Sequence, residues 1–166
     1  MTGRPASADC ERLLTVLVEN GVRFILIGGW AAILHGSARS TMDVDVVYCR
    51  EAENIGRLVA ALGPYAPYPR DVPEGLPFHW DDRTIKLGLN FTLNTTLGPM
   101  DLLGDVPGGG SYVELLPFAE ETSAFGVSFQ VVKLEKLIAL KRATGRAKDL
   151  LPLAELTALL ADRGSV

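Results

Sequence analysis

The 166-residue sequence contains no long apolar segment. No hydrophobic run approaches the ~18 residues that a membrane-spanning helix needs, and the first residues lack the apolar core of a secretory signal. We therefore expect a cytoplasmic protein with no membrane partner. The same length, with 48% hydrophobic residues, allows one buried core but not two ordinary domains, so residues 1–166 are expected to form a single domain.

Cysteine and histidine are also scarce. The two cysteines, Cys10 and Cys49, are far apart and form no CxxC pair, and only His35 and His79 could join them as zinc ligands. We therefore expect neither a disulfide nor a four-ligand zinc site, and both cysteines are interpreted as small packing residues.

Positive charge is in deficit, because 16 lysines and arginines stand against 20 acids, giving a net charge of −4. This balance argues against a broad, sequence-independent grip on nucleic acid. A local basic face is still allowed, since six of the cations fall within residues 133–148. The alternative interpretation of that cluster is a solvated helical face.

The most informative stretch is Gly28–Val47, which reads GGWAAILHGSARSTMDVDVV. The apolar run Phe24–Ile27 predicts a strand that ends at Gly28 and Gly29, and Trp30–His35 predicts a helix that begins at once. Adjacent glycines permit positive φ and a close approach to bare backbone, while the free N–H groups of a new helix point into the same space. Such a place suits a phosphate group.

Two acids follow this glycine turn at alternate positions. The β-branched run 43–47 predicts a strand, so Asp43 and Asp45 project from one face with Cα atoms roughly 6.5 Å apart. Like charges that close disfavour joint ionisation, and a hard divalent cation, Mg²⁺ first with Mn²⁺ as a substitute, would keep both charged. The alternative is a solvated acidic strand on the outside of a sheet, and the upstream glycine turn favours the metal site.

Apolar spacing, caps and breakers predict the remaining elements. Residues 1–7 are expected to be disordered. We expect helices at 9–19, 50–62 and 134–144, with a last helix capped by Asp149, and strands at 22–27, 85–93, 99–106 and 125–132, the last at a sheet edge. Residues 133–162 thus form a C-terminal helical part. The Pro-rich segment 63–77 is expected to lack regular structure, either as a lid over a site or as an arm packed by its tyrosines.

One acid stands inside an apolar strand. Asp101 is flanked by Met100, Leu102 and Leu103, and burying a lone carboxylate there would be costly, so we expect it to face a polar cleft. Asp105 is the alternative. The element order predicts a single α/β (α+β) domain with a mixed sheet of about four or five strands and helices packed mainly on one side.

The two glycines, the short helix and the pattern Arg39-x-Thr41-x-Asp43-Val44-Asp45 resemble the signature of the nucleotidyltransferase superfamily, the fold of DNA polymerase β and the aminoglycoside nucleotidyltransferases. Together with the distal segment LEKLIALKRATGRAKDL, the chain is similar to small bacterial nucleotidyltransferase-like proteins of abortive-infection and toxin–antitoxin systems. The resemblance extends from about Cys10 to Leu160.

The resemblance implies Mg²⁺-dependent transfer of a nucleoside monophosphate from a nucleoside triphosphate such as ATP to an acceptor hydroxyl. Gly28 and Gly29 would then cradle phosphates by backbone N–H, and Asp43 and Asp45 would hold the cations. In the superfamily a third carboxylate comes from a neighbouring strand, and Asp101 matches that position; it would ligate a cation and help deprotonate the acceptor.

Four further residues are predicted to bind the triphosphate: Ser37, Arg39, Thr41 and Lys141. Lys141 falls on the apolar stripe of its predicted helix, at seven residues from Leu134, so we expect its ammonium to reach the polar cleft and, without nucleotide, one of the three acids. The alternative is that Lys141 snorkels past the sheet edge. One departure from the superfamily pattern is the pair Gly29-Trp30, because many members carry Gly-Ser there and this pair lacks the serine hydroxyl.

The resemblance leaves the acceptor open. A toxin-like enzyme would modify transfer RNA or a protein and would have an antitoxin partner, whereas an antibiotic-modifying enzyme would normally need a larger acceptor domain than this length allows. A non-catalytic nucleotide-binding or partner-binding module with the same fold is the rival interpretation, although both glycines and all three acids are present.

Overall fold

The computed structural model describes residue 5 and residues 7–164. The expected disorder of residues 1–7 therefore falls mostly outside the described residues. Within them, the helices are α1 (Cys10–Glu19), α2 (Gly28–Leu34), α3 (Ala52–Leu62), α4 (Asp82–Leu87), α5 (Tyr112–Leu115), α6 (Leu134–Thr144) and α7 (Leu150–Gly164). Short 3₁₀ turns occupy Gly63–Tyr65, Leu116–Phe118 and Ala147–Asp149.

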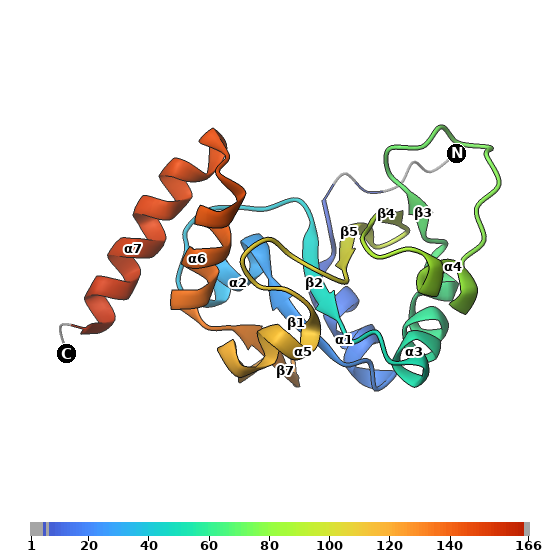
Figure 1. The fold of residues 1–166 in the computed structure, drawn as a ribbon, viewed down its shortest axis with the longest axis horizontal. Coiled ribbons are helices and arrows are strands. Elements are labelled where there is room, and N and C mark those ends of the chain that lie inside the picture. Colours follow the sequence, from blue (N-terminus) through green and yellow to red (C-terminus); the bar gives the residue numbers. More distant parts are fainter. Residues whose placement is uncertain (1–4, 6, 165–166) are drawn as a thin grey trace.

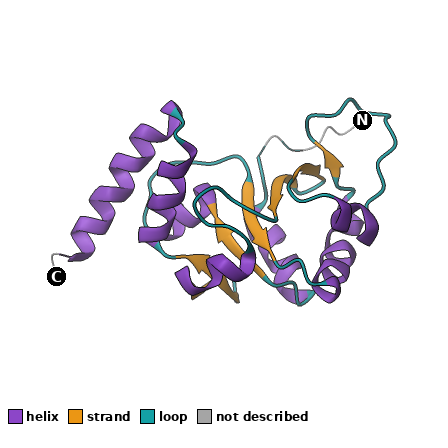
Figure 2. Ribbon diagram, viewed as in Figure 1, coloured by secondary structure: helices purple, strands orange, loops and turns teal. Residues whose placement is uncertain are grey.

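A mixed sheet forms the centre of the molecule (Figures 1 and 2). Its strands are β1 (Phe24–Ile27), β2 (Val44–Tyr48), β3 (Tyr68–Pro69), β4 (Phe91–Thr95), β5 (Gly98–Leu103), β6 (Ala119–Ala124) and β7 (Val127–Val132). Their spatial order is β3-β4-β5-β2-β1-β7-β6, with parallel pairs β1/β7 and β2/β5 and antiparallel pairs elsewhere. The prediction of a mixed α/β fold is confirmed.

The sheet has seven described strands, more than the four or five expected. The strand β6 was missed because its sequence, AEETSA, has no apolar alternation and is held by pairing with β7. That pairing also moves the edge from β7, where it was predicted, to β6. The two-residue strand β3 was missed because it lies among prolines, which argue against regular structure.

The predicted strand at 85–93 is wrong in its first part, where the chain forms α4. The side chain of Asp81 accepts a hydrogen bond from the backbone N–H of Thr84 at 2.8 Å, which caps this helix. Only Phe91–Thr95 is extended, as β4. A short helix with one buried residue, Ile85, has the same apolar spacing as part of a strand, so the pattern alone could not separate them.

Several local predictions are confirmed. Asp9 caps α1 through a hydrogen bond from the Arg12 N–H, and α6 ends where Gly145 adopts a left-handed φ of 62°. The helix α3 ends at Leu62, as expected from Gly63.

One connected cluster of buried apolar side chains runs from α1 through the central strands to α6 and reaches Leu156 of α7. All four residues of β1 are buried, so both faces of the sheet are covered at its centre, more than the one-sided packing expected. Helices α6 and α7 lie side by side at one end of the molecule, with α3 and α4 together at the other (Figure 1). No described helix is both long and apolar enough to cross a membrane.

Candidate active site

Three aspartates meet where β2 begins beside the parallel strand β5. The register of β2 against β5 pairs Asp45 directly with Asp101, and Asp43 lies one residue before β2 begins. Each of the three offers a carboxylate oxygen, and these oxygens lie within 4.8 Å of one another. Asp43, Asp45 and Asp101, which we call the acid trio, are therefore arranged so that one cation could contact all three.

The electrostatics of the acid trio favour a bound cation. Burial raises the pKa of Asp45 well above its ordinary value, and the negative charges of Asp43 and Asp101 raise it further. Burial also raises the pKa of Asp101, although its hydrogen bond with Asp45 and the charge of Arg70 oppose this. Oδ1 of Asp45 is buried without a hydrogen-bond partner among the described residues. An oxygen-only donor set with an orphaned carboxylate oxygen fits a hard divalent ion such as Mg²⁺.

The glycine turn lies directly against the acid trio. Strand β1 ends at Ile27 and α2 begins at Gly28, two residues earlier than the predicted start at Trp30. Gly28 has a φ of 70°, and a Cβ there would overlap the Asp45 carboxylate. A Cβ on Gly29 would lie 2.6 Å from Oγ1 of Thr41. Both glycines are thus needed for this close approach.

A cleft with two lobes opens above the acid trio. The polar lobe, of about 460 Å³, is lined by every residue that the sequence analysis assigned to the site: Gly28, Gly29, Ser37, Arg39, Thr41, Asp43, Asp45, Asp101 and Lys141. Residues that the sequence analysis had not placed in a binding site also line it: Ala32, Ser40, Arg70, Arg146, Lys148, Asp149, Pro152, Glu155 and Leu156.

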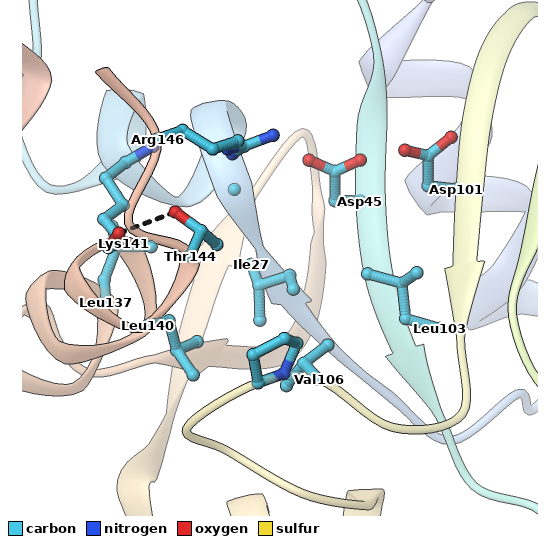
Figure 3. Close-up of a pocket in the computed structure, with 12 residues that line it drawn as sticks. Ile27, Asp45, Asp101, Leu103, Val106, Leu137, Leu140, Lys141, Thr144 and Arg146 are labelled. Atoms are coloured by element: carbon cyan, nitrogen blue, oxygen red, sulfur yellow. Dashed lines mark hydrogen bonds between the residues drawn. The ribbon is translucent and has the colours of Figure 1, made fainter. Parts of the chain in front are cut away.

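The apolar lobe, of about 230 Å³, adjoins the polar lobe at Gly28, Asp45 and Asp101 (Figure 3). Its apolar wall consists of Ile27, Leu103, Val106, Pro107, Leu137 and Leu140. Figure 3 shows the carboxylates of Asp45 and Asp101 on neighbouring strands, directed to the same side of the cleft, with Arg146 extending toward Asp45 from the segment after α6 and Lys141 on α6 farther from the acids. The cleft therefore offers a charged compartment and an apolar one on either side of the acids.

Lys141 lies in the cleft, but the prediction that it pairs with one of the three acids is wrong. Its Nζ is 3.9 Å from Oδ1 of Asp149, whose Oδ2 accepts hydrogen bonds from Arg146 Nε at 2.9 Å and Thr144 Oγ1 at 2.8 Å. Burial acts to raise the pKa of Asp149, but these hydrogen bonds and the two positive charges outweigh it and lower the pKa. Asp149 directly precedes α7, but its carboxylate pairs with Lys141 and Arg146 and does not cap the helix as predicted.

Arg70 takes the place that was predicted for Lys141 beside an acid. Its Nη2 is 2.9 Å from Oδ1 of Asp101 and also donates to the carbonyl of Leu93 at 2.8 Å. Strand β3 positions it by pairing with β4. The proline-rich surroundings gave no signal for this strand, and the only hint in the sequence was that three clustered acids need a cation nearby.

Ser37 and Arg39 lie in the polar lobe, and both contact Glu155, a residue that the sequence did not point to. Ser37 Oγ donates to Glu155 of α7 at 2.5 Å, and Nε of Arg39 is 3.9 Å from the same carboxylate. Thr41 Oγ1 donates to Asp43 Oδ1 at 3.4 Å. No short-range pattern links Glu155 to Ser37, because 118 residues separate them.

Other candidates lie outside the cleft. Asp105, the alternative third acid, is exposed, lines neither lobe of the cleft, and borders an open hollow with residues 106–110. Cys10 and Cys49 are buried free thiols, as the packing interpretation required. Among the described residues, the acid trio is the only group of three or more His, Cys, Asp or Glu side chains close enough to share a metal ion.

The fold and the acid trio beside a glycine turn define the nucleotidyltransferase class, and comparison with known families agrees. Residues 9–103 match the model of a family described as a nucleotidyltransferase of unknown function (DUF6036). This match covers more than half of the chain, and the chain therefore belongs to that family.

A solved structure extends the likeness across the fold. The lincosamide antibiotic adenylyltransferase LnuA, in its lincomycin-bound crystal structure, superimposes with a TM-score of 0.62 over 93% of this chain and 99% of that chain, at 17% sequence identity. At this identity the likeness establishes a common fold and no more. No curated protein sequence gives a significant match.

Proposed function

We propose that the protein is a Mg²⁺-dependent nucleotidyltransferase that moves a nucleoside monophosphate from a nucleoside triphosphate to an acceptor hydroxyl. The observation that carries this proposal is the acid trio, three carboxylates with oxygens within 4.8 Å of one another, two of which, Asp45 and Asp101, line both the cation-lined lobe and the apolar lobe. Mg²⁺ bound there would supply positive charge to the attacking and leaving oxygens. Asp43, Asp45 and Asp101 would hold it.

The chain's own residues would position the reactants. Gly28 and Gly29 present bare backbone beside the acids, and Lys141 supplies a positive charge at the junction of both lobes, so the triphosphate would lie in the polar lobe. Asp101 would accept the proton of the acceptor hydroxyl. The acceptor oxygen then bonds to the α-phosphorus, and the bond from this phosphorus to the bridging oxygen breaks, releasing pyrophosphate.

We propose RNA or protein as the first candidate acceptor, as in toxin-like members of the superfamily. With such an acceptor, we also propose an antitoxin partner. A small-molecule acceptor is the second candidate, favoured by two observations. The apolar lobe adjoins the acids, and the antibiotic adenylyltransferase LnuA matches this chain nearly end to end, so a chain of this length does not argue against a small acceptor.

Transfer of label tests the proposal. The protein is incubated with Mg²⁺, a cell extract and each triphosphate carrying ³²P at either the α or the γ position, and the products are separated by size. We expect label from the α position alone to be incorporated, because the γ phosphate leaves with pyrophosphate. Label from the γ position would indicate phosphoryl transfer, and no incorporation from any triphosphate would favour the non-catalytic binding module. The size of the labelled product separates RNA or protein from a small molecule.

A further inference from the structure

The loop after α2 holds an internal anion. Glu155 extends from α7 into the polar lobe, where its Oε1 accepts a hydrogen bond from Ser37 Oγ at 2.5 Å and its Oε2 accepts one from the Ala38 N–H at 3.0 Å. The guanidinium of Arg39 lies 3.9 Å from Oε1. We call Ser37, Ala38 and Arg39 the anion cradle, because a hydroxyl, a backbone amide and a guanidinium converge there on one carboxylate.

The Ser37 hydroxyl of the anion cradle is oriented to donate a hydrogen bond to an anion. Ser37 Oγ accepts the N–H of Arg39 at 3.1 Å, so its own hydrogen is directed away from that bond and is free for an anion. The hydrogen bond from Ser37 lowers the pKa of Glu155, the bond from Ala38 adds to this, and the charge of Arg39 contributes although burial opposes it. The lowered pKa favours the ionised form of Glu155, and a hydroxyl, an amide N–H and a guanidinium are donors that also bind phosphate.

The anion cradle lies in the lobe proposed to hold the triphosphate. Its Ser37 and Arg39 line the same cavity as Gly28, Gly29 and the acid trio. A phosphate offers three acceptor oxygens and more negative charge than a carboxylate. A guanidinium also matches phosphate geometry well. Resting on the proposed function, we propose that the anion cradle is a phosphate subsite of the triphosphate, filled by the Glu155 carboxylate without nucleotide and vacated when the triphosphate binds.

Only the Glu155 side chain needs to move. Helix α7 is anchored independently by buried Leu156, by Leu159 beside Gly36, and by Arg163, whose Nη2 lies 3.0 Å from Nδ1 of His35. The Glu155 side chain is 27% exposed, so rotation about its own bonds can carry it into solvent while the helix stays in place.

Calorimetry with the substitution Glu155→Gln tests this exchange. Inorganic triphosphate and ATP, each with Mg²⁺, are titrated into the parent protein, Glu155→Gln and the control Asp162→Asn, which removes one exposed charge from the same helix. Removing an internal competitor raises the fraction of protein ready to bind, so Glu155→Gln should bind both ligands about threefold to tenfold more tightly, and Asp162→Asn should bind like the parent. Thermal melts verify that each variant folds.

A second substitution separates competition from a general charge effect. Ser37→Ala in the Glu155→Gln background removes a cradle donor, so the gain in affinity should disappear. Unchanged or weaker binding by Glu155→Gln would overturn the inference, as would a gain that survives Ser37→Ala. If Glu155→Gln gains affinity for inorganic triphosphate while no variant binds ATP, the anion cradle stands and the nucleotidyltransferase proposal fails. Binding of neither ligand to any variant would overturn both.

Discussion

Replacing Asp45 by asparagine should make the metal-free protein more stable. Asp45 shares a hydrogen bond with Asp101, and the introduced side-chain amide could donate to the same neighbour, so the change removes a charge and keeps the shape. At 4.8 Å and an effective dielectric constant of about 20, repulsion between two carboxylates is about 3 kcal/mol. The positive charge of Arg70 offsets part of this repulsion, and Asp45 reduces the rest when it keeps its proton. We therefore expect a net gain of roughly 1 kcal/mol, or about 2–4 °C in Tm for a chain of this size.

The sign of the pH dependence is fixed by the raised pKa of Asp45. A carboxyl whose pKa is higher in the folded than in the unfolded state costs stability as pH rises from about 4, its unfolded value, through the folded pKa. The gain from Asp45→Asn should therefore be absent in acid, grow as the pH rises above about 4, and be largest above the folded pKa of Asp45. Mg²⁺ should reverse the order, since it stabilises the parent by binding and the variant much less.

Thermal melts in chelator and in Mg²⁺, from pH 4 to pH 8, measure both effects. Asp105→Asn is the matched control, because Asp105 is exposed and lies outside the cleft. It should change Tm little at any pH. A clear loss of stability in chelator for Asp45→Asn at pH 8 would show that this carboxylate is structural, and the metal-site argument would then fail.

The remaining predictions concern the ligand and the cleft cations. Calorimetry should detect ATP binding only with Mg²⁺ or Mn²⁺, and equal affinity in chelator would point to a module that does not use the acids. Lys141→Met should weaken Mg-ATP binding by about tenfold or more. The control Lys136→Met should have almost no effect, because Nζ of Lys136 lies 4.2 Å from the Phe118 ring centre, outside the cleft. Equal small losses for the two variants would show that Lys141 is not part of the site. Asp149→Asn should lower the free energy of unfolding by roughly 1–3 kcal/mol in a denaturant titration at neutral pH. Because the pKa of Asp149 is lowered in the folded state, this difference should vanish as acid protonates Asp149 in the parent protein. A difference that persists at low pH would contradict the ion-pair account.

The parts of the fold that the sequence predicted well are those with short-range causes. Asp9 and Gly145 act within a few residues through a cap and a left-handed turn, so they fixed the ends of α1 and α6. The alternation of Asp43 and Asp45 after two glycines has a similar local origin. The structure brings these acids to Asp101 through the register of β2 and β5. The resemblance to the superfamily, and no local pattern, predicted that Asp101 would face the other two acids.

The parts that were missed depend on long-range contacts. Strand β6 is polar and exists through its pairing with β7, and Arg70 reaches Asp101 only because a two-residue strand adds to β4. Glu155 meets Ser37 only when α7 packs back against α6. Lys141 was placed correctly in the cleft but with the wrong partner, because the position of Asp149 beside it is set by a 3₁₀ turn that no periodicity predicts.

The most direct test of the central claim, nucleotidyl transfer at the acid trio, is pyrophosphate release by a matched pair of variants. The parent, Asp45→Asn and Asp105→Asn are each supplied with Mg²⁺, the triphosphate that gives α-label incorporation, and the acceptor fraction. We predict that the parent and Asp105→Asn release pyrophosphate in step with incorporation, while folded Asp45→Asn loses at least about a hundredfold in rate. Release by Asp45→Asn at the parental rate, or incorporation without pyrophosphate, would contradict the account.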